Sequence, residues 1–275
     1  MTMSSRVEPR SAWTVITDPI AGVGAGTLGF ITTFGAISRL AGHMFRVGLR
    51  RPFEGRELVR QLYSIGAQSF SIAFLTALFT GAVMALQFGW SLERFGAASY
   101  VGKVVSVGFV MELGPVLTAL LVGGRVGAGI TAELGSMSVT EQIDAVRALG
   151  ADPVKKLVWP RVFACTVSMP ILALMADFVG TAGGMLVAVA EQGLTASYYI
   201  DQVLTTVDIG EVLHGLIKAL FFGFSFGLIG CYQGLQTRGG TEGVGRSTTR
   251  TVVITSITIL VSDFLLGKAL LPFVG

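Results

Sequence analysis

The sequence has little charge for its length. Charged residues make up 13% of the 275 positions, whereas apolar residues make up 52%. A soluble domain of this size needs far more charge to cover its surface. Glycine is abundant, with 37 residues, and in membrane proteins it lets helices approach closely. The composition therefore excludes an ordinary soluble domain and favours a polytopic helical membrane protein, for which we expect no nucleic-acid partner.

Cysteine, histidine and the common catalytic motifs are also scarce. The two cysteines, Cys165 and Cys231, lie in apolar stretches, and the two histidines, His43 and His214, are isolated. They predict neither a disulfide framework nor a metal site. The sequence contains no G-x-x-x-x-G-K-[ST] or H-E-x-x-H. We therefore expect no catalytic residue, metal or cofactor in this chain; if ATP is used, another subunit must bind it together with Mg²⁺.

Five apolar stretches are long enough to cross a membrane. The hydrocarbon core of a bilayer requires about 20 apolar residues in a helix, and residues 61–92, for example, contain no charge at all. The fold class predicted is an all-α integral membrane protein with five transmembrane helices. The predicted spans cover about residues 66–90, 101–132, 159–190, 209–235 and 251–271.

The segment before the first span has a different character. Between residues 27 and 49, apolar residues recur at roughly helical spacing, and arginines accumulate toward the end. This pattern predicts an amphipathic helix in the inner membrane interface, held by anionic headgroups. The alternative is a sixth span over about residues 20–37, which is glycine-rich and of marginal length.

Lysine and arginine in the connections predict the orientation. They accumulate before the first span, between the second and third spans, and between the fourth and fifth spans. The connection of residues 191–208 contains three acidic residues and no cation. Because cytoplasmic loops carry an excess of Lys and Arg, we expect a cytoplasmic N-terminus and an outer C-terminus.

A short polar helix is predicted on the inner side, over residues 138–149. Ser138 and Glu141 have the spacing of a capping box, and Gly150 followed by Asp152 provides stop signals. Such a helix is about 16 Å long, too short to span a membrane. One apolar face suits a groove on a partner protein; the alternative is that it packs on the protein's own inner surface. The face consists of Val139, Ile143, Val146 and Leu149.

The second predicted span carries a carboxylate next to helix-breaking residues. Glu112 is followed by Gly114 and Pro115, and a proline inside a helix removes a backbone hydrogen bond and favours a kink. Glu112 is interpreted as part of a substrate cavity or, alternatively, as a carboxylate satisfied by backbone or a neighbouring cation. Further along, Arg125 lies among glycines, where we expect a packing joint rather than a lipid contact.

Three more charges lie inside predicted spans. Asp177, Lys218 and Asp263 occupy the third, fourth and fifth spans, where charges are costly and usually face the helix bundle. We expect Lys218 to pair with one of the aspartates and to fix helix packing. A proton relay is the alternative.

Several short motifs together resemble one family. Most of them lie between residues 112 and 153, and the others precede the first span or begin the third and fifth spans. The motifs are Glu-Leu-Gly-Pro (112–115), Gly-Arg-x-Gly (124–127), Thr-Ala-Glu-x-Gly (131–135), Thr-Glu-Gln (140–142), Ala-Asp-Pro (151–153), Val-Arg-Gln-Leu-Tyr (59–63), Pro-Arg (160–161) and Thr-Thr-Arg-Thr-Val-Val (248–253). Over about residues 26–271 the chain resembles the MlaE/YrbE family, the permease subunits of MCE-associated ABC lipid transporters.

The resemblance implies a function and a set of partners. It implies a homodimeric permease in the bacterial inner membrane, with a lipid bound between the two copies and two ATPase subunits on the helix of residues 138–149, which acts as a coupling helix. It also implies an MCE-domain protein outside and, in some systems, a STAS-domain subunit. Residues 1–60 are then a cytoplasmic N-terminal segment and residues 61–275 the permease domain. Family members often carry Arg where this chain has Met111, so we expect no headgroup contact from that position.

The resemblance also assigns residues to two predicted sites. The predicted lipid-binding residues are Glu112, Arg60, Leu113, Pro115 and Leu86. The predicted ATPase-coupling residues are Glu133, Ser138, Glu141, Gln142, Ile143, Val146, Arg147 and Leu149. Two other functions stay open: an ion-coupled secondary transporter that uses intramembrane carboxylates, and a membrane scaffold that transports nothing.

Overall fold

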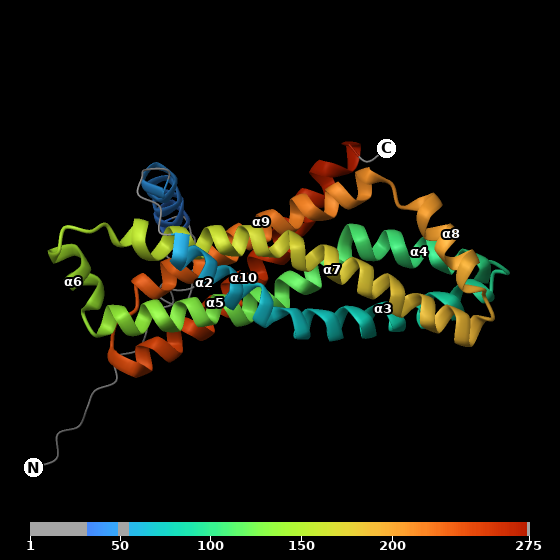
Figure 1. Ribbon diagram of the computed structural model, residues 1–275, viewed down its shortest axis with the longest axis horizontal. Helices are drawn as coiled ribbons and strands as arrows, with labels where there is room; N and C mark the ends of the chain where they lie inside the picture. Colours follow the sequence, from blue (N-terminus) through green and yellow to red (C-terminus); the bar gives the residue numbers. More distant parts are fainter. Residues whose placement is uncertain (1–31, 49–54, 274–275) are drawn as a thin grey trace, which may run out of the picture. The chain divides into compact units, whose positions relative to one another are not determined.

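The computed structural model describes residues 32–48 and 55–273. The chain divides into two compact units, Met1–His43 and Met44–Gly275. The described part of the first unit is helical, because residues 32–48 form one helix that continues into the second unit. The second unit contains five long helical segments (Figure 1). The described residues contain no strand, so the predicted all-α membrane fold is confirmed.

Each long segment is long and apolar enough to cross a membrane, and three of them contain a change of helix type. The first consists of α2 (Gly55–Ile65), the 3₁₀ turn η1 (Ala67–Ser69) and α3 (Phe70–Glu93). The second consists of η2 (Ala98–Tyr100), α4 (Val101–Gly108), the π-helix η3 (Phe109–Leu113) and α5 (Gly114–Val139).

The other segments follow in order. The third consists of the π-helix η4 (Val154–Val158) and α7 (Trp159–Gln192). The fourth is α9 (Ile209–Leu235), and the fifth is α10 (Gly240–Leu270), which ends in η5 (Leu271–Phe273). Two short helices lie between the segments, α6 (Gln142–Ala148) and α8 (Ala196–Thr206).

The observed helices are mostly longer than the predicted spans. The fourth span agrees at both ends, but α5 continues to Val139 and α10 begins at Gly240. The 31 residues of α10 extend about 46 Å, which exceeds a hydrocarbon core of about 30 Å. Hydropathy identifies only the part in lipid, so it misses polar ends that continue the same helix. Likewise, α2 runs across the predicted boundary at residue 60.

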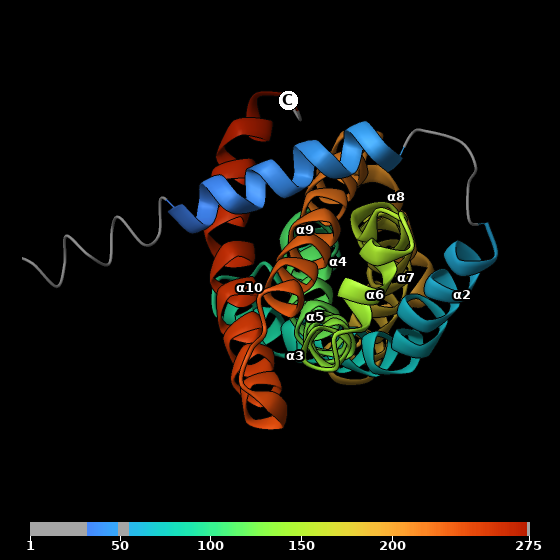
Figure 2. The same ribbon diagram turned by 90° about the vertical axis from the view of Figure 1, so that its left-hand side faces the viewer.

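Small residues allow the long helices to pack closely. The most extensive packing is between α3 and α7, between α5 and both α9 and α10, and between α7 and α9. A Cβ atom added at Gly81 of α3 would overlap with the carbonyl of Gly180 on α7, and one at Gly230 of α9 would press on the backbone of Gly127 on α5. The repeated glycines therefore serve helix crossing. Figure 2 shows α5 and α9 near the middle of the bundle.

The two short helices lie at opposite ends of the second unit (Figure 1). At one end, α8 covers the start of α4: Gln202 donates to the carbonyl of Ser99, and Tyr199 is buried. Burial raises the pKa of the Tyr199 phenol above its usual range. At the other end lies α6. The predicted inner and outer connections thus lie at separate ends, and which end faces the cytoplasm stays a prediction.

The N-terminal helix is described from residue 32 onward. Within the second unit, Phe45 stacks on Phe224 with ring centroids 5.8 Å apart. Gly48 lies against the Trp159 ring and leaves no room for a Cβ atom. Placement of this helix in the membrane interface stays a prediction. Most of the alternative sixth span lies outside the described residues.

Candidate functional site

The second long segment changes its helical geometry at Pro115. Because Pro115 has no backbone N–H, the carbonyl of Met111 lacks its usual partner four residues on. The chain adopts the π-helix η3 directly before this point, and the N–H of Gly114 donates to the carbonyl of Phe109. Single π turns in α-helices frequently mark functional sites. The predicted kink is therefore a local change of helix type that leaves one carbonyl free.

Lys218 of α9 fills the position opposite this free carbonyl. Its side chain is fully buried, and its Nζ lies 3.2 Å from the Met111 carbonyl oxygen. The same Nζ pairs with Glu112 Oε2 at 2.6 Å and with Asp263 Oδ1 of α10 at 2.6 Å. The ammonium donates hydrogen bonds to the Met111 carbonyl and to Glu112, whereas Asp263 contributes an ion pair without a hydrogen bond. The expectation that Lys218 pairs with an aspartate is confirmed.

This charge network, which consists of Glu112, Lys218 and Asp263, joins the second, fourth and fifth segments. It holds two carboxylates and one ammonium, which leaves one formal negative charge when all three groups are ionised. The Glu112 side chain is 47% exposed, whereas the Asp263 side chain is 20% exposed. Gly267, one turn after Asp263, keeps space open beside Glu112 Oε1. The network is therefore closed on the Lys218 side and open at Glu112.

Asp177 does not join this network. It lies on α7, is 7% exposed, and its Oδ1 has no hydrogen-bond partner among the described residues. That oxygen occupies the place where a Cβ atom of residue 114 would be. The glycine of the Glu-Leu-Gly-Pro motif is thus required by contact with α7, in addition to any effect on the kink. Of the two aspartates, only Asp263 pairs with Lys218.

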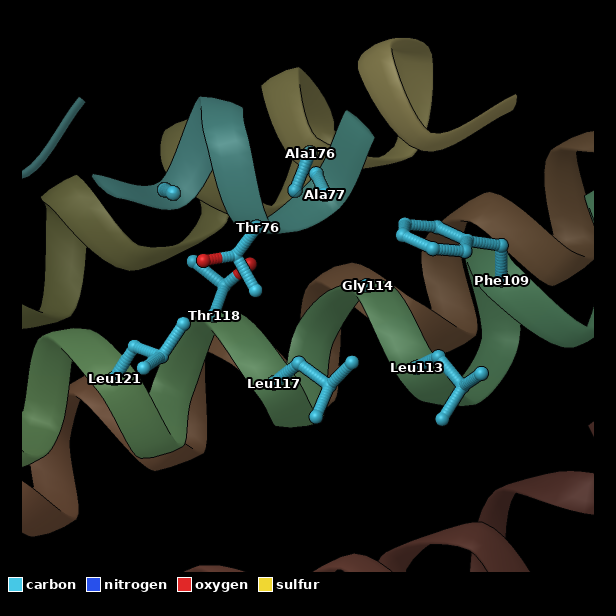
Figure 3. Close-up of a pocket in the computed structure, with 10 residues that line it drawn as sticks. Thr76, Ala77, Phe109, Leu113, Gly114, Leu117, Thr118, Leu121 and Ala176 are labelled. Atoms are coloured by element: carbon cyan, nitrogen blue, oxygen red, sulfur yellow. The ribbon is translucent and has the colours of Figure 1, made fainter. Parts of the chain in front are cut away.

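A narrow pocket lies between α3, α5 and α7, beside η3 (Figure 3). The side chains of Thr76 and Thr118 point toward each other across it, and Phe109 lies at one end. Three leucines of the second segment form one wall. Leu113, a predicted lipid-binding residue, is among them. The lining residues are Ala73, Thr76, Ala77, Phe109, Leu113, Gly114, Leu117, Thr118, Leu121 and Ala176.

The other predicted lipid-binding residues are dispersed. Pro115 is buried against Gly215 of α9, whereas Leu86 is 51% exposed on α3. Arg60 lies on α2 with its side chain 80% exposed, and it pairs with Glu57 of the same helix at 3.8 Å. The structure therefore brings Glu112, Leu113 and Pro115 to one place and leaves Arg60 apart.

The predicted capping box before α6 is wrong. Helix α5 continues through Ser138, whose hydroxyl donates to the carbonyl of Thr237 at 3.3 Å. Glu141 instead adopts a left-handed backbone conformation, with φ of 59°, and α6 begins at Gln142. The physical reason is that the apolar pattern of α5 extends past Ser138, so this residue is already inside a helix when the chain turns.

Helix α6 presents only part of its predicted face to the surface. Ile143 is 4% exposed, whereas Leu149, directly after the helix, is 86% exposed. Arg147 pairs with Asp144 at 2.7 Å on the exposed side, where Gln142 also lies. The buried Ile143 fits packing on the protein's own surface. Any partner would contact Leu149 and the polar side chains instead.

An ion pair ties two long helices together at the end of the bundle where α6 lies. Arg161 of α7 is largely buried; its Nη2 lies 3.1 Å from Glu133 Oε2 of α5, and its Nη1 donates to the Leu157 carbonyl. The Glu133 side chain is 63% exposed. Sequence reasoning placed Glu133 in the coupling region but gave Arg161 no role. The available signal was the position of Arg161 at the start of the third predicted span, where a cation can pair with an acidic residue near the end of a neighbouring helix.

Comparisons with known proteins cover most of the chain. The sequence pattern of a family described as Permease MlaE matches residues 58–269. A protein of Rickettsia felis named as a probable ABC transporter permease protein is 41% identical over 246 residues, which are 90% of this chain and 95% of the relative. A Synechocystis protein with a similar name is 39% identical over 228 residues, 83% of this chain and 87% of the relative.

A plant protein is also similar. Protein TRIGALACTOSYLDIACYLGLYCEROL 1, chloroplastic, of Arabidopsis thaliana is 36% identical over 229 residues, 83% of this chain and 65% of the relative. The range matched by the family pattern includes all three members of the charge network as well as α6.

Proposed function

The chain belongs to the MlaE permease family, and on this basis we propose that it moves phospholipid or a related lipid between the inner membrane and an MCE-protein conduit. Family membership makes it an ABC transporter permease, whose ATP is hydrolysed by separate partner subunits. The proposal adds the lipid, the conduit and a second copy of this chain as partners. It also adds the bacterial inner membrane, with a cytoplasmic N-terminus and a periplasmic C-terminus.

The observation that carries the proposal is the charge network at the π-helix. A fully buried ammonium between two carboxylates is costly to place in a membrane, so such residues usually mark a substrate path or a moving part. The network opens at Glu112, whose side chain is about half exposed. A carboxylate at this position can contact a polar headgroup while the apolar helices around it contact acyl chains.

The plant relative supports the choice of lipid as substrate. Its printed name includes the name of a glycolipid, trigalactosyldiacylglycerol. In the present chain the exposed side chains of α3 and of residues 253–265 in α10 include many large apolar ones, with several phenylalanines and leucines. An amphiphile held between two copies would therefore meet apolar walls and a few polar groups, as small-molecule sites generally do.

The same helix links the network to the proposed ATPase contact. Helix α5 contains 26 residues and is about 39 Å long, so it connects the π-helix at one end with α6 at the other. We assign the ATPase contact to the exposed residues around α6, above all Leu149 and Arg147. The ion pair between Glu133 and Arg161 would pass a movement of α6 to α7.

Reconstitution tests the proposal directly. The chain is placed in vesicles with its ATPase subunits and a fluorescent phospholipid, and lipid movement is measured with and without ATP. ATP-dependent movement that is unaffected by dissipating the proton gradient is the expected result. Movement by the chain alone that stops when the gradient collapses would instead establish the ion-coupled transporter. Absence of any lipid movement in the complete complex would favour the scaffold.

A further inference from the structure

A second polar cluster lies where α2, α3 and α5 meet, well away from the charge network. Arg125 of α5 donates from Nη1 to Ser69 Oγ at 2.8 Å and from Nη2 to Gln68 Oε1 at 3.4 Å. Both acceptors belong to the 3₁₀ turn η1 that separates α2 from α3. Ser64 also donates to Gln68 Oε1, at 3.5 Å. The Gln68 oxygen therefore has two donors, and the Gln68 side chain is exposed.

The positive charge of this cluster has no counter-charge among residues 32–48 and 55–273. Among the described residues, no carboxylate lies within ion-pair distance of Arg125, and its partners Ser69 and Gln68 are neutral. A guanidinium stays protonated in proteins, so Arg125 cannot relieve the cost of its charge by losing a proton. An anion from outside the chain would supply the missing charge.

The depth of Arg125 matches that of lipid phosphates. It is held against Ser69, immediately before α3. The 24 residues of α3 extend about 36 Å and end at Glu93, the first charge at the other end. A hydrocarbon core is about 30 Å thick. If Glu93 lies at one boundary of the core, Arg125 lies at the opposite boundary, on the side of α6.

The cluster also continues the wall of the narrow pocket. Leu113, Leu117 and Leu121 line that pocket, and Arg125 follows them at the same spacing of four residues. Residues spaced by four form one ridge along a helix. Arg125, Gln68 and Ser64 are exposed, and nothing lies within 4 Å of a Cβ atom built at Gly129, the next position of this ridge. The surface thus offers an apolar ridge with a cationic end.

We propose that Arg125, with the Gln68 amide NH₂ group, binds the phosphate of a lipid headgroup whose acyl chain lies along the leucine ridge toward the charge network. The guanidinium supplies the planar fork that suits phosphate oxygens. This site deepens the proposed function and rests on it, because it assigns the place where a phosphate-bearing substrate is held on the α6 side.

The test measures binding without transport. The purified full-length chain is mixed with equal amounts of phosphatidylglycerol and digalactosyldiacylglycerol of the same acyl chains, and bound lipid is counted by native mass spectrometry. The unmodified chain is expected to prefer the phosphate lipid. Arg125→Gln should lower phosphatidylglycerol affinity roughly tenfold and abolish the preference. Arg125→Lys, which keeps the charge but loses the fork, should lie between them.

Two further variants separate binding from folding. Arg94→Gln makes the same change of charge at the other end of α3 and should keep the preference. Gln68→Ala removes the exposed amide while the Arg125–Ser69 hydrogen bond stays, and it should weaken the preference roughly threefold. Thermal unfolding of each variant is followed in parallel by tryptophan fluorescence.

Three outcomes would overturn the proposal. If Arg125→Gln lowers the unfolding temperature but keeps the lipid preference, Arg125 only ties α5 to the turn η1. If glycerol 3-phosphate displaces the lipid at equal concentration, the site binds soluble phosphate instead. If Arg94→Gln loses the preference equally, the effect is one of net charge. Failure of the proposed function is a separate result: lipid movement would be absent from the reconstituted complex even where Arg125-dependent binding holds.

Discussion

Lys218 and Arg125 are both cations in apolar helices, but their surroundings differ. Lys218 is fully buried and is bracketed by two carboxylates and a backbone carbonyl. Arg125 is exposed and meets only neutral oxygens. The first cation is satisfied inside the chain, so its removal should damage the fold. Arg125 has a positive charge that no described carboxylate neutralises, so its removal should weaken the binding of an anionic ligand. The same distinction, between residues that hold the fold and residues that face a ligand or a partner, is tested by four further substitutions, in order of expected effect.

The largest effect is expected for Lys218→Met. This change leaves Glu112 and Asp263 close together without their cation, and breaking a buried ion pair in this way costs about 3–5 kcal/mol. The yield of folded protein and its unfolding temperature should both fall sharply. Adding Glu112→Gln and Asp263→Asn to the same chain should recover part of the loss. A single variant as stable as the original would show that the network is dispensable for folding.

Gly114→Ala should come next. The added methyl group would overlap with Asp177 Oδ1, and overpacking of this kind costs about 1–3 kcal/mol. Gly129→Ala is the matched control, because nothing lies near that position, and in a helix interior it should be neutral or slightly stabilising. Thermal unfolding measures both variants. Combining Gly114→Ala with Asp177→Ala should relieve the overlap; equal damage in the double variant would mean that Gly114 serves the π-helix itself.

Glu112→Gln tests whether the exposed carboxylate of the charge network acts in lipid transport and not in stability. Glu112 is half exposed and Lys218 keeps its pair with Asp263, so stability should change little. We expect lipid transport by the reconstituted complex to fall roughly tenfold, equivalent to about 1.4 kcal/mol. Asp208→Asn, on the α8 side, serves as the control. Unchanged transport by Glu112→Gln, with unchanged lipid occupancy, would remove Glu112 from the site.

The smallest effect concerns α6. Leu149 is 86% exposed and Ile143 is 4% exposed, so the two apolar residues should respond differently to aspartate. Leu149→Asp should leave the chain folded but weaken co-purification of the ATPase severalfold. Ile143→Asp should lower the unfolding temperature of the isolated chain, because it buries a charge. If Leu149→Asp retains the full amount of ATPase, the ATPase contact lies elsewhere in the chain.

Much of the fold could be predicted because lipid restricts the choices. A chain in a bilayer must satisfy its backbone internally, so apolar runs of sufficient length became helices as expected. Boundaries failed where polar sequence continued a helix, as at Gly240, or where an apparent cap fell inside one, as at Ser138. A local pattern carries no information on how far the preceding helix extends.

The sequence predicted the individual charged residues of the charge network but not that all three would meet at one place. Glu112, Lys218 and Asp263 were each recognisable as costly charges, and a pair with an aspartate was expected. Their meeting with the Met111 carbonyl depends on the packing of α9 and α10 against the second segment, which no local pattern reports. Arg125 was interpreted as a packing joint, and its hydrogen bonds to η1 agree with that role. What the sequence could not show is that no carboxylate of the described part of the chain joins it.

The bond from Lys218 to Met111 has a consequence for biogenesis. Pro115 has no N–H group to donate to the Met111 carbonyl. The donor that takes its place, the Lys218 ammonium, lies 107 positions later in the chain. Spans emerge from the ribosome in order, so the second span enters the membrane with a bare carbonyl and an unneutralised Glu112. We therefore expect the first three spans to remain a substrate for membrane quality control until the fourth span is inserted. Lys218 of that span then binds the Met111 carbonyl and Glu112, so these polar groups are no longer unpaired in the membrane.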